Sequence, residues 1–592
     1  MKKNKIISLI ICSLAIVAMI FLPAMISMST NLYTSVVMKK TGSLPTVKTY
    51  EKLKKLIESN KSRYSYEMPQ AVFNDLWDDR IITNDAINSN PFAMVDDSVA
   101  ISESVSDFGI KGLFESSSIN QSASDYSSTN TQVTGVDEAD ILKNDGKYIY
   151  AKSGNKLIII DAFPAQTMKK VAEIEIEEGY RLLELYINGD KLFLITDNGY
   201  KYSARNAQTK MLVFTMTDRA NPELIKTFEV KGTYTSSRKI NDKIYVFTGL
   251  NTYMENGNYV VPQYRESNVG AFIDVSLTDV QYVPNDNYSL FTQILAFDMG
   301  TPLNNPKMVT YLGEGANNIY MSQDSLYMAQ SRYGETTIYK FSLATEYPRF
   351  EAKGTVEGTI VNQFAMDEFD GNFRIATTDG SKCSVFILGP SMHKLGSLLN
   401  IAPREQIKSV RFEGTRGYVV TFRNTDPLFV IDLSSVRKPR VLGKLQIPGY
   451  STYLHTYDEN HVIGFGYDGS SWGTNGKLKI ALFDITDVTN PKEMFTEQID
   501  ARTSELLTNH KSLLFSKEKN LIAFAVGDYS SNDVGKVFTI TLEKGFELRG
   551  EIKHTDDVSR MLFMDDILYG VSEKTVSAHD INTVKELKSV EL

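Results

Sequence analysis

The stretch NTQVTGVDEADILKNDGKYIYAKSGNKLIIID, residues 130–161, begins a repeating pattern that decides the fold of this chain. Its two apolar runs, residues 148–151 and 157–160, follow the turn formers Asn144-Asp145-Gly146 and are separated by Ser153-Gly154-Asn155. Short apolar runs with Gly- and Asn-containing turns between them predict antiparallel strands joined by tight turns. The same pattern recurs from here to the C-terminus.

The recurring unit has a nearly constant length. Phe373 and Tyr418, which begin two successive apolar strands, are 45 residues apart. In most units a second strand follows and ends in an acidic residue and a turn, and residues 214–222 align without a gap with residues 483–491, both ending in Asn-Pro. Proline ends a strand because it has no N–H to donate. The predicted strand starts are Tyr148, Leu192, Ile244, Leu326, Phe373, Tyr418, Val462, Ile522 and Ile567.

A repeat of this length, made of four short strands and no helix, is typical of a β-propeller blade. We therefore predict an all-β fold, with a single β-propeller of eight or nine four-stranded blades over residues 131–592. A β-sandwich would not keep this period. Residues 132–136 are expected to close the ring by pairing into the last blade, so that no open sheet edge is left.

The N-terminal residues 1–30 predict an export signal or membrane anchor. Lysines precede an apolar run over residues 6–28, which is long enough to cross a bilayer. The sequence leaves open whether the segment is cleaved. Because the lysines place the N-terminus in the cytoplasm, we expect a single-pass protein of the cell membrane with its propeller outside, or a secreted protein if cleavage occurs.

A spacer over residues 31–130 is expected to join this segment to the propeller. Within it, residues 47–59 place Leu53, Leu56 and Ile57 at helical spacing, which predicts a short amphipathic helix. We expect this helix to pack on the side of the main domain; a stalk or a partner-binding helix is the alternative. Residues 60–130 are rich in Ser, Asn and Asp, a composition that indicates a flexible linker.

Composition excludes several classes of function. The formal net charge is −9 and the carboxylates outnumber the scattered lysines and arginines, so nucleic acid is not an expected partner. The two cysteines are Cys12, in the apolar N-terminal run, and Cys383, which leaves no pair for an internal disulfide in the exported part. The sequence contains no phosphate-binding loop, nucleophile elbow or His-Glu-x-x-His pair.

Several longer motifs resemble a family of exported bacterial and archaeal proteins with a C-terminal β-propeller domain, distantly related to WD40 propellers. The motifs are QVTGVDEADILKNDGKYIY at 132–150, DEFDGNFRIATT at 367–378, HVIGFGYD at 461–468 and LKIALFDITDVTNPKEM at 478–494. The resemblance implies an exported propeller preceded by a helix and a Ser-rich spacer. It implies no reaction or ligand.

The acidic residues Asp137, Glu138 and Asp140 are candidate ligands for Ca²⁺, which prefers carboxylate oxygens. The alternative is that they accept backbone hydrogen bonds at a turn or at the closure of the ring. No other cofactor is expected. The six histidines are dispersed along the chain and do not suggest a metal site.

Long insertions fall mostly between the second and third strands of their units, for example at residues 197–210, 249–289, 468–477 and 528–536. Loops at one fixed point of a propeller repeat emerge on one face, and repeat proteins commonly bind partners there. Aromatic side chains in these loops are candidate contacts for a partner, unless they only pack their own loops. The candidates are Tyr200, Tyr253, Tyr259, Tyr264, Trp472 and Tyr529.

These observations favour a non-catalytic, membrane-anchored binding protein that presents its loop-rich face to an extracellular protein or glycan. One alternative is a hydrolase or lyase of an envelope polymer with its active site at the channel mouth. Another is a structural component of the envelope. Two or more buried carboxylates with perturbed pKa values in the channel would favour the enzyme.

Overall fold

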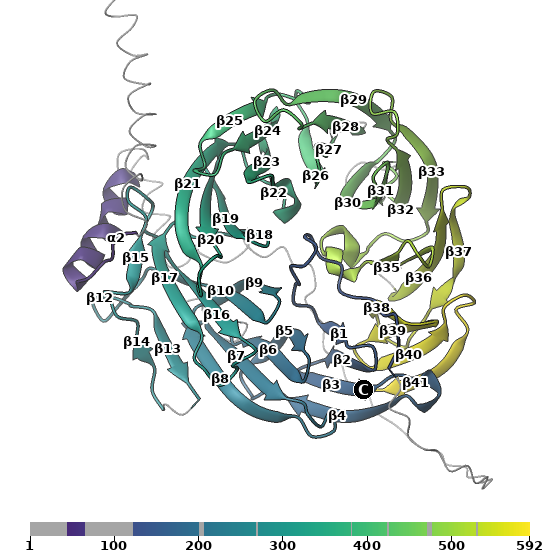
Figure 1. Cartoon of the computed structure of the whole chain (residues 1–592), viewed down its shortest axis with the longest axis horizontal. Helices are drawn as coiled ribbons and strands as arrows, with labels where there is room; N and C mark the ends of the chain where they lie inside the picture. The colour runs from purple at the N-terminus through teal and green to yellow at the C-terminus, as the bar shows by residue number, and fades with distance from the viewer. Residues whose placement is uncertain are drawn as a thin grey trace, which may run out of the picture.

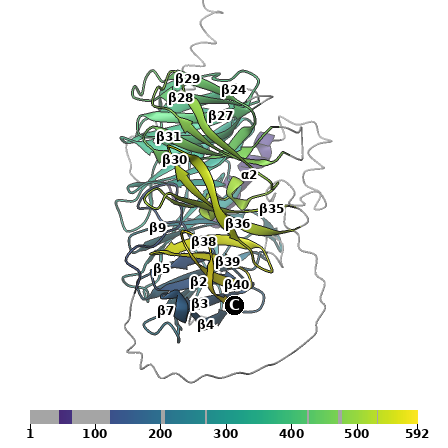
Figure 2. The same ribbon diagram turned by 90° about the vertical axis from the view of Figure 1, so that its right-hand side faces the viewer.

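A computed structural model of the chain describes residues 44–64, 122–199, 206–267, 270–380, 382–422, 426–469, 476–528 and 531–592. The strands form nine antiparallel blades around a central channel, so the fold is a nine-bladed β-propeller (Figure 1). Seven blades have four strands, and two carry additional strands at their outer edges. Seen from the side in Figure 2, the blades make a disc that is thinner along the channel than across the ring.

Each blade is built from strands that are consecutive in the chain, apart from one insertion. Blade 1 comprises β1 (Leu142–Asn144), β2 (Tyr148–Ser153), β3 (Lys156–Asp161) and β4 (Lys169–Glu175), and blade 2 comprises β5 (Arg181–Asn188), β6 (Lys191–Asp197), β7 (Gln208–Thr215) and β8 (Glu223–Lys231). Blade 3 comprises β9 (Thr233–Ile240), β10 (Lys243–Asn251), β16 (Leu290–Asp298) and β17 (Lys307–Gly313), and blade 4 comprises β18 (Asn318–Met321), β19 (Ser325–Arg332), β20 (Glu335–Ser342) and β21 (Arg349–Glu357). Blade 5 comprises β22 (Met366–Phe369), β23 (Asn372–Asp379), β24 (Lys382–Leu388) and β25 (Lys394–Leu398), and blade 6 comprises β26 (Gln406–Glu413), β27 (Arg416–Phe422), β28 (Asp426–Asp432) and β29 (Arg440–Ile447). Blade 7 comprises β30 (Tyr450–Asp458), β31 (His461–Tyr467), β32 (Leu478–Asp484) and β33 (Lys492–Ile499), blade 8 comprises β34 (Leu514–Ser516), β35 (Leu521–Asp528), β36 (Ser531–Thr541) and β37 (Gly545–Ile552), and blade 9 comprises β38 (Val558–Met564), β39 (Ile567–Ser572), β40 (Thr575–Asp580) and β41 (Glu586–Glu591).

The nine apolar runs found in the sequence are the second strands of the nine blades, which confirms the repeat and sets the number of blades at nine. These strands are apolar on both sides because each blade packs between two others. In β6, for example, six of seven residues are buried, whereas the outer strand β4 alternates and carries exposed lysines and glutamates. Charged side chains on an outer strand discourage pairing with another chain.

The ring closes by side-chain packing between blades 9 and 1 and not by an exchanged strand. Ile149 and Ile158 of blade 1 share one buried cluster with Tyr569 and Val576 of blade 9. The prediction that residues 132–136 pair into the last blade is wrong, because all four strands of blade 9 come from the C-terminal end of the chain.

An earlier segment instead lies beside β38. Tyr126 forms an isolated bridge with Met564, and the backbone of Ser127 donates to the carbonyl of Phe563 at 3.0 Å. Residues 122–130 therefore pack against the propeller. The prediction that they belong to a flexible linker is wrong. Of the rest of the predicted linker 60–130, residues 60–64 are helical, and residues 65–121 lie outside the described residues.

The long insertion of blade 3 lies on the outer rim together with the one α-helix among the described residues, α2 (Tyr50–Tyr64). The insertion contains the short strands β11 (Met254–Glu255), β12 (Asn258–Tyr259), β13 (Gln263–Glu266), β14 (Ile273–Asp274) and β15 (Val280–Tyr282). β13 pairs with β8 of blade 2, and β15 pairs in parallel with β17 of blade 3.

Helix α2 packs on this insertion. Leu53 and Ile57 lie in one buried cluster with Tyr259 and Phe291, and the Tyr50 hydroxyl accepts a hydrogen bond from the backbone N–H of Tyr259 at 2.6 Å. The prediction of a helix packed on the side of the main domain is therefore confirmed. Within the described residues no helix has the length and apolar character to cross a membrane, and the predicted segment 1–30 lies outside them.

Candidate functional site

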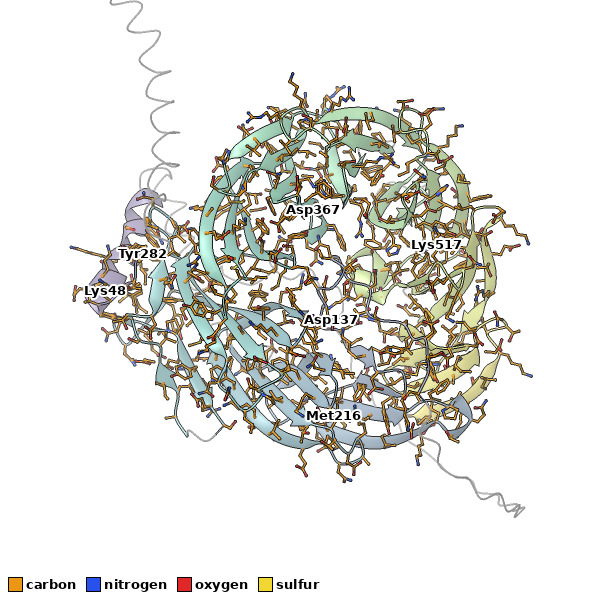
Figure 3. The ribbon with its side chains drawn as sticks, viewed as in Figure 1. Lys48, Asp137, Met216, Tyr282, Asp367 and Lys517 are labelled. Carbon is orange, nitrogen blue, oxygen red and sulfur yellow. The ribbon has the colours of Figure 1, made fainter. Side chains whose placement is uncertain are left out.

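The channel is occupied by residues 127–141, which we call the central segment. It comes from beside β38, runs among the innermost strands of the blades, and leads into β1. Figure 3 shows Asp137, in this segment, near the middle of the ring. The sequence that marks the start of the repeat thus lies on the axis of the fold.

Side-chain amides attach the central segment to distant blades. Asn130 Nδ2 donates to the Tyr453 hydroxyl at 3.1 Å and to the carbonyl of His510 at 2.8 Å. Gln132 Nε2 donates to the carbonyls of Gln363 and Met366 at 3.0 and 3.1 Å. These bonds satisfy carbonyl groups that face the channel, which would otherwise lose hydrogen bonds on burial.

Backbone hydrogen bonds hold the second half of the segment. Asp137 and Lys239 exchange two backbone hydrogen bonds of 2.8 Å, and the N–H of Leu185 donates to the carbonyl of Asp140 at 2.9 Å. The segment therefore lies as a short strand beside the first strands of blades 2 and 3. Its acidic side chains are held at defined positions.

Each of the three acidic candidates lies against basic groups. Asp137 Oδ1 accepts from Lys143 Nζ at 2.7 Å. A carboxylate oxygen of Glu138 lies 3.7 Å from Arg238 Nη2 and 3.3 Å from His510 Nε2. Asp140 Oδ1 lies 3.1 Å from Arg560 Nη2.

The pKa values of the two buried carboxyls are lowered. Burial by itself would raise the pKa of Glu138, but the charge of Arg238 and the contact with His510 hold it well below its usual range. Burial likewise opposes ionisation of Asp140, and the charges of Arg560 and Lys511 outweigh it and lower its pKa. Both side chains are therefore carboxylates at neutral pH.

The predicted calcium ligands Asp137, Glu138 and Asp140 are close in sequence but face different cations. Among the described residues, no group of three or more His, Cys, Asp or Glu side chains is arranged to hold a metal ion. The alternative prediction was that these residues accept backbone hydrogen bonds at a turn or at the closure of the ring. Glu138 and Asp140 each accept one backbone N–H, from Gln132 and Ile141, in addition to their contacts with cations.

A pocket of about 520 Å³ lies at one mouth of the channel, with Glu138 and Asp140 in its wall. It is also lined by Tyr234 and Arg560, near the starts of β9 and β38, by Glu184 in β5, and by Lys152 near the end of β2. Neighbouring strands in a blade are antiparallel, so first strands start on the face where second strands end. The pocket therefore opens on the face from which the loops between second and third strands emerge.

Short 3₁₀ helices in the connections between blades build the remaining wall. They are η3 (Gln363–Ala365), η4 (Glu505–Leu507) and η5 (His510–Ser512). Each is capped by the side-chain oxygen of the residue before it, Asn362, Ser504 or Asn509, which accepts the backbone N–H of Phe364, Leu506 or Lys511 respectively. A further 3₁₀ helix, η1 (Ala165–Thr167), lies between β3 and β4, away from the pocket lining.

Sequence reasoning missed this wall. The only local signal for it was the capping residues Asn362, Ser504 and Asn509 in connections between strands. Such residues also occur in ordinary turns, so they do not by themselves indicate a site.

The three aromatic candidates that the structure describes do not line the pocket. Tyr253, Tyr259 and Tyr264 belong to the cluster beneath α2 on the rim, where Tyr259 is 5% exposed and Tyr264 stacks on Phe228 with 5.7 Å between ring centroids. Tyr253 and Tyr259 pack within the insertion and against α2, whereas Tyr264 packs on β8 of blade 2. Tyr200, Trp472 and Tyr529 lie outside the described residues.

Comparison with known proteins places this architecture in a sequence family. A family model described as a beta propeller domain matches residues 126–584. An uncharacterized protein of Methanocaldococcus jannaschii is 28% identical over 546 residues, covering 79% of this chain and 83% of the relative. An uncharacterized protein of Archaeoglobus fulgidus is 25% identical over 563 residues, covering 79% and 85%.

Solved structures are similar at a lower level. The dihydro-heme d1 dehydrogenase NirN is 11% identical with a TM-score of 0.33, over 78% of this chain and 75% of that protein. A putative 6-phosphogluconolactonase of Bacteroides fragilis is 12% identical with a TM-score of 0.33, over 52% and 93%.

Proposed function

We propose that this protein, which belongs to the beta propeller domain family, is a non-catalytic binding protein that takes the end of an extracellular glycan into its channel-mouth pocket. The observation that carries the proposal is the pocket itself, on the loop-rich face and walled by hydrogen-bonding side chains. Its volume of about 520 Å³ lies within the range of small-ligand sites.

The neutral groups of the wall suit a ligand rich in hydroxyls. Thr235, Ser236, Asn318 and Asn362 supply hydroxyl and amide groups, which can both donate and accept hydrogen bonds. Phe364 also lines the pocket, but it is buried and its ring packs edge-on against Tyr453 and His510, so the neutral contacts for a ligand come from the hydroxyl and amide groups. A protein partner would need a far larger contact surface than this pocket. The aromatic residues described on the rim pack against other residues of the protein and do not form such a surface.

The electrostatics of the pocket support binding over hydrolysis. A glycoside hydrolase needs a carboxylic acid that keeps its proton at neutral pH, which requires a raised pKa. Glu138 and Asp140 are two buried carboxylates with perturbed pKa values in the channel, the feature expected above for an enzyme, but both pKa values are lowered and both groups are engaged by arginines. Carboxylates in this state are poor proton donors and weak bases.

We propose that the pocket is outside the cell and that the chain is held at the membrane. The support is the sequence of residues 1–30, with lysines before an apolar run. Helix α2 follows that segment closely in the chain and packs on the rim of the ring, far from the channel mouth in Figure 1. An anchor attached there would leave the pocket open to the medium.

A glycan array probed with the full-length protein tests the proposal. The matched variants are Thr235→Trp, which places a bulky ring at the pocket from an exposed position, and Thr235→Ser, which does not. We expect wild type and Thr235→Ser to bind the same glycans and Thr235→Trp to lose them while melting normally. Equal binding by all three would contradict a binding site here, and shortening of the bound glycan during incubation would contradict a non-catalytic one.

A further inference from the structure

Lys152 differs from the other cations of the pocket. It lies at the end of β2, is partly buried, and lines the pocket beside the central segment, whose Ile141 carbonyl accepts its backbone N–H at 2.9 Å. Within the part of the chain that the structure describes, its ammonium group makes no hydrogen bond to a carboxylate and senses Glu184 and Glu573 only at longer range.

The other three basic side chains of the pocket, Arg238, Lys511 and Arg560, are each paired. Arg238 lies 3.7 Å from Glu138, and Lys511 is paired with Glu184. Arg560 lies 3.1 Å from Asp140 and 2.6 Å from Glu505. These pairs neutralise one another inside the protein. They leave Lys152 as the cation of the pocket without a protein anion in contact, among the described residues.

A cation that is partly removed from water and not paired is destabilised, and an incoming anion relieves that cost. A carboxylate on the ligand would form a charge-assisted hydrogen bond with the ammonium group, which is stronger than a bond between neutral groups. The four acidic side chains of the wall balance its four cations, Lys152 included, so the pocket has no surplus of positive charge for a ligand that carries many negative charges. The arrangement therefore suits one acidic group next to several hydroxyls.

We propose that the ligand is an acidic sugar and that Lys152 binds its carboxylate, while the neutral side chains of the pocket bind its hydroxyls. This rests on the proposed function, because it names the kind of glycan that the pocket selects. Lysine presents a compact charge with three rotatable donors, so it can reach a single carboxylate without the fixed geometry that arginine imposes.

The surroundings of Lys152 predict how this selectivity depends on pH. Burial lowers the pKa of Lys152, and the nearby positive charges of Arg181 and Arg560 lower it further, while Glu184 and Glu573 act in the opposite direction. The net direction is downward. The preference for an acidic sugar should therefore fall on going to alkaline pH earlier than an ordinary lysine would lose its proton.

The test uses methyl glycosides of glucuronic, galacturonic and N-acetylneuraminic acid. Each acid is compared with its methyl ester, which has no negative charge and serves as the control. Binding to the full-length chain is measured by calorimetry in a sugar-free zwitterionic detergent. We expect at least one acid to bind roughly tenfold more tightly than its ester, since a hydrogen bond to a charged group contributes about that factor. Lys152→Gln should bind acid and ester equally, and Lys152→Arg should keep most of the preference.

The outcomes separate this inference from the proposed function. If acids and esters bind wild type equally, if Lys152→Gln keeps the preference, or if the array retains only neutral glycans, the role of Lys152 is refuted and the pocket still binds glycans. If wild type binds no glycan on the array and no acidic sugar, or if Thr235→Trp binds them equally well, the proposed function is refuted and this inference with it. Melting curves of the two Lys152 variants show whether a lost preference reflects unfolding.

Discussion

The ion pair between Asp140 and Arg560 should be the most sensitive point of the central segment. Arg560 Nε lies 3.3 and 3.1 Å from the two carboxylate oxygens of Asp140, and its Nη2 lies 3.1 Å from one of them. The two side chains are 3% and 4% exposed. Glu505, which also binds Arg560, is 40% exposed and can be solvated by water instead.

Replacing Arg560 by Met leaves a buried carboxylate with only Lys511 and the backbone N–H of Ile141 to stabilise it. We expect this change to lower the free energy of unfolding by about 3–5 kcal/mol, as when one partner of a buried pair is removed. Asp140→Asn should cost about 2 kcal/mol, because Arg560 keeps Glu505. Glu505→Gln should cost under about 1 kcal/mol, as for an exposed pair.

Urea titrations followed by circular dichroism and by tyrosine fluorescence measure these differences, and coincident transitions check that one cooperative step is observed. In the double variant Asp140→Asn/Arg560→Met no charge is left unpaired in this pair. It should therefore be more stable than Arg560→Met alone by about 1–2 kcal/mol. A cost below about 1 kcal/mol for Arg560→Met, or a double variant that loses the sum of the two single costs, would refute the reasoning.

Three further predictions follow from other contacts. Burial, together with the charges of Arg411 and His510, lowers the pKa of His455 to about 3, so the folded state favours the neutral ring. The stability that the neutral ring contributes is fully present above the ordinary histidine pKa of about 6.5 and is lost as the pH falls toward about 3. Between about pH 7.5 and about pH 5.5 wild type should lose roughly 1 kcal/mol more stability than His455→Gln, and parallel pH profiles would contradict this. Leu53→Asp should release α2 from the rim, seen as rapid proteolysis before residue 122, while the β-type circular dichroism is unchanged, because Leu53 is fully buried in a cluster at the rim that α2 shares with the insertion and with strands of blade 3. A chain that starts at residue 122 should melt cooperatively. A chain that starts at residue 141 should not, because it lacks the central segment. Equal melting temperatures of the two chains would show that the channel contacts are dispensable.

The blade architecture could be predicted because it is local. Each second strand, such as residues 191–197, must be apolar on both sides to pack between neighbouring blades, and the turns around it need Gly, Asn or Asp. Both requirements appear within a few residues of each other in the chain. The same holds for α2, whose apolar spacing indicated a helix with one packed side, although it begins at Tyr50 and not at residue 47.

The closure and the site depend on contacts that local patterns do not encode. Residues 132–136 have a strand-like pattern, but they lie in the channel because blade 9 already has four strands of its own. Tyr259 looked like an exposed contact residue and is buried, since α2 covers the insertion that carries it.

The sequence by itself determined the repeat, the all-β fold and the position of the acidic residues at the start of the propeller. Only the tertiary structure decided what those residues do. Asp140 meets Arg560 across 420 positions in the chain, and Glu138 meets Arg238 from blade 3 and His510 from the connection between blades 7 and 8. The ring brings these side chains to one axis. There the pKa of each carboxyl, and so its charge, depends on neighbours that are distant in the chain.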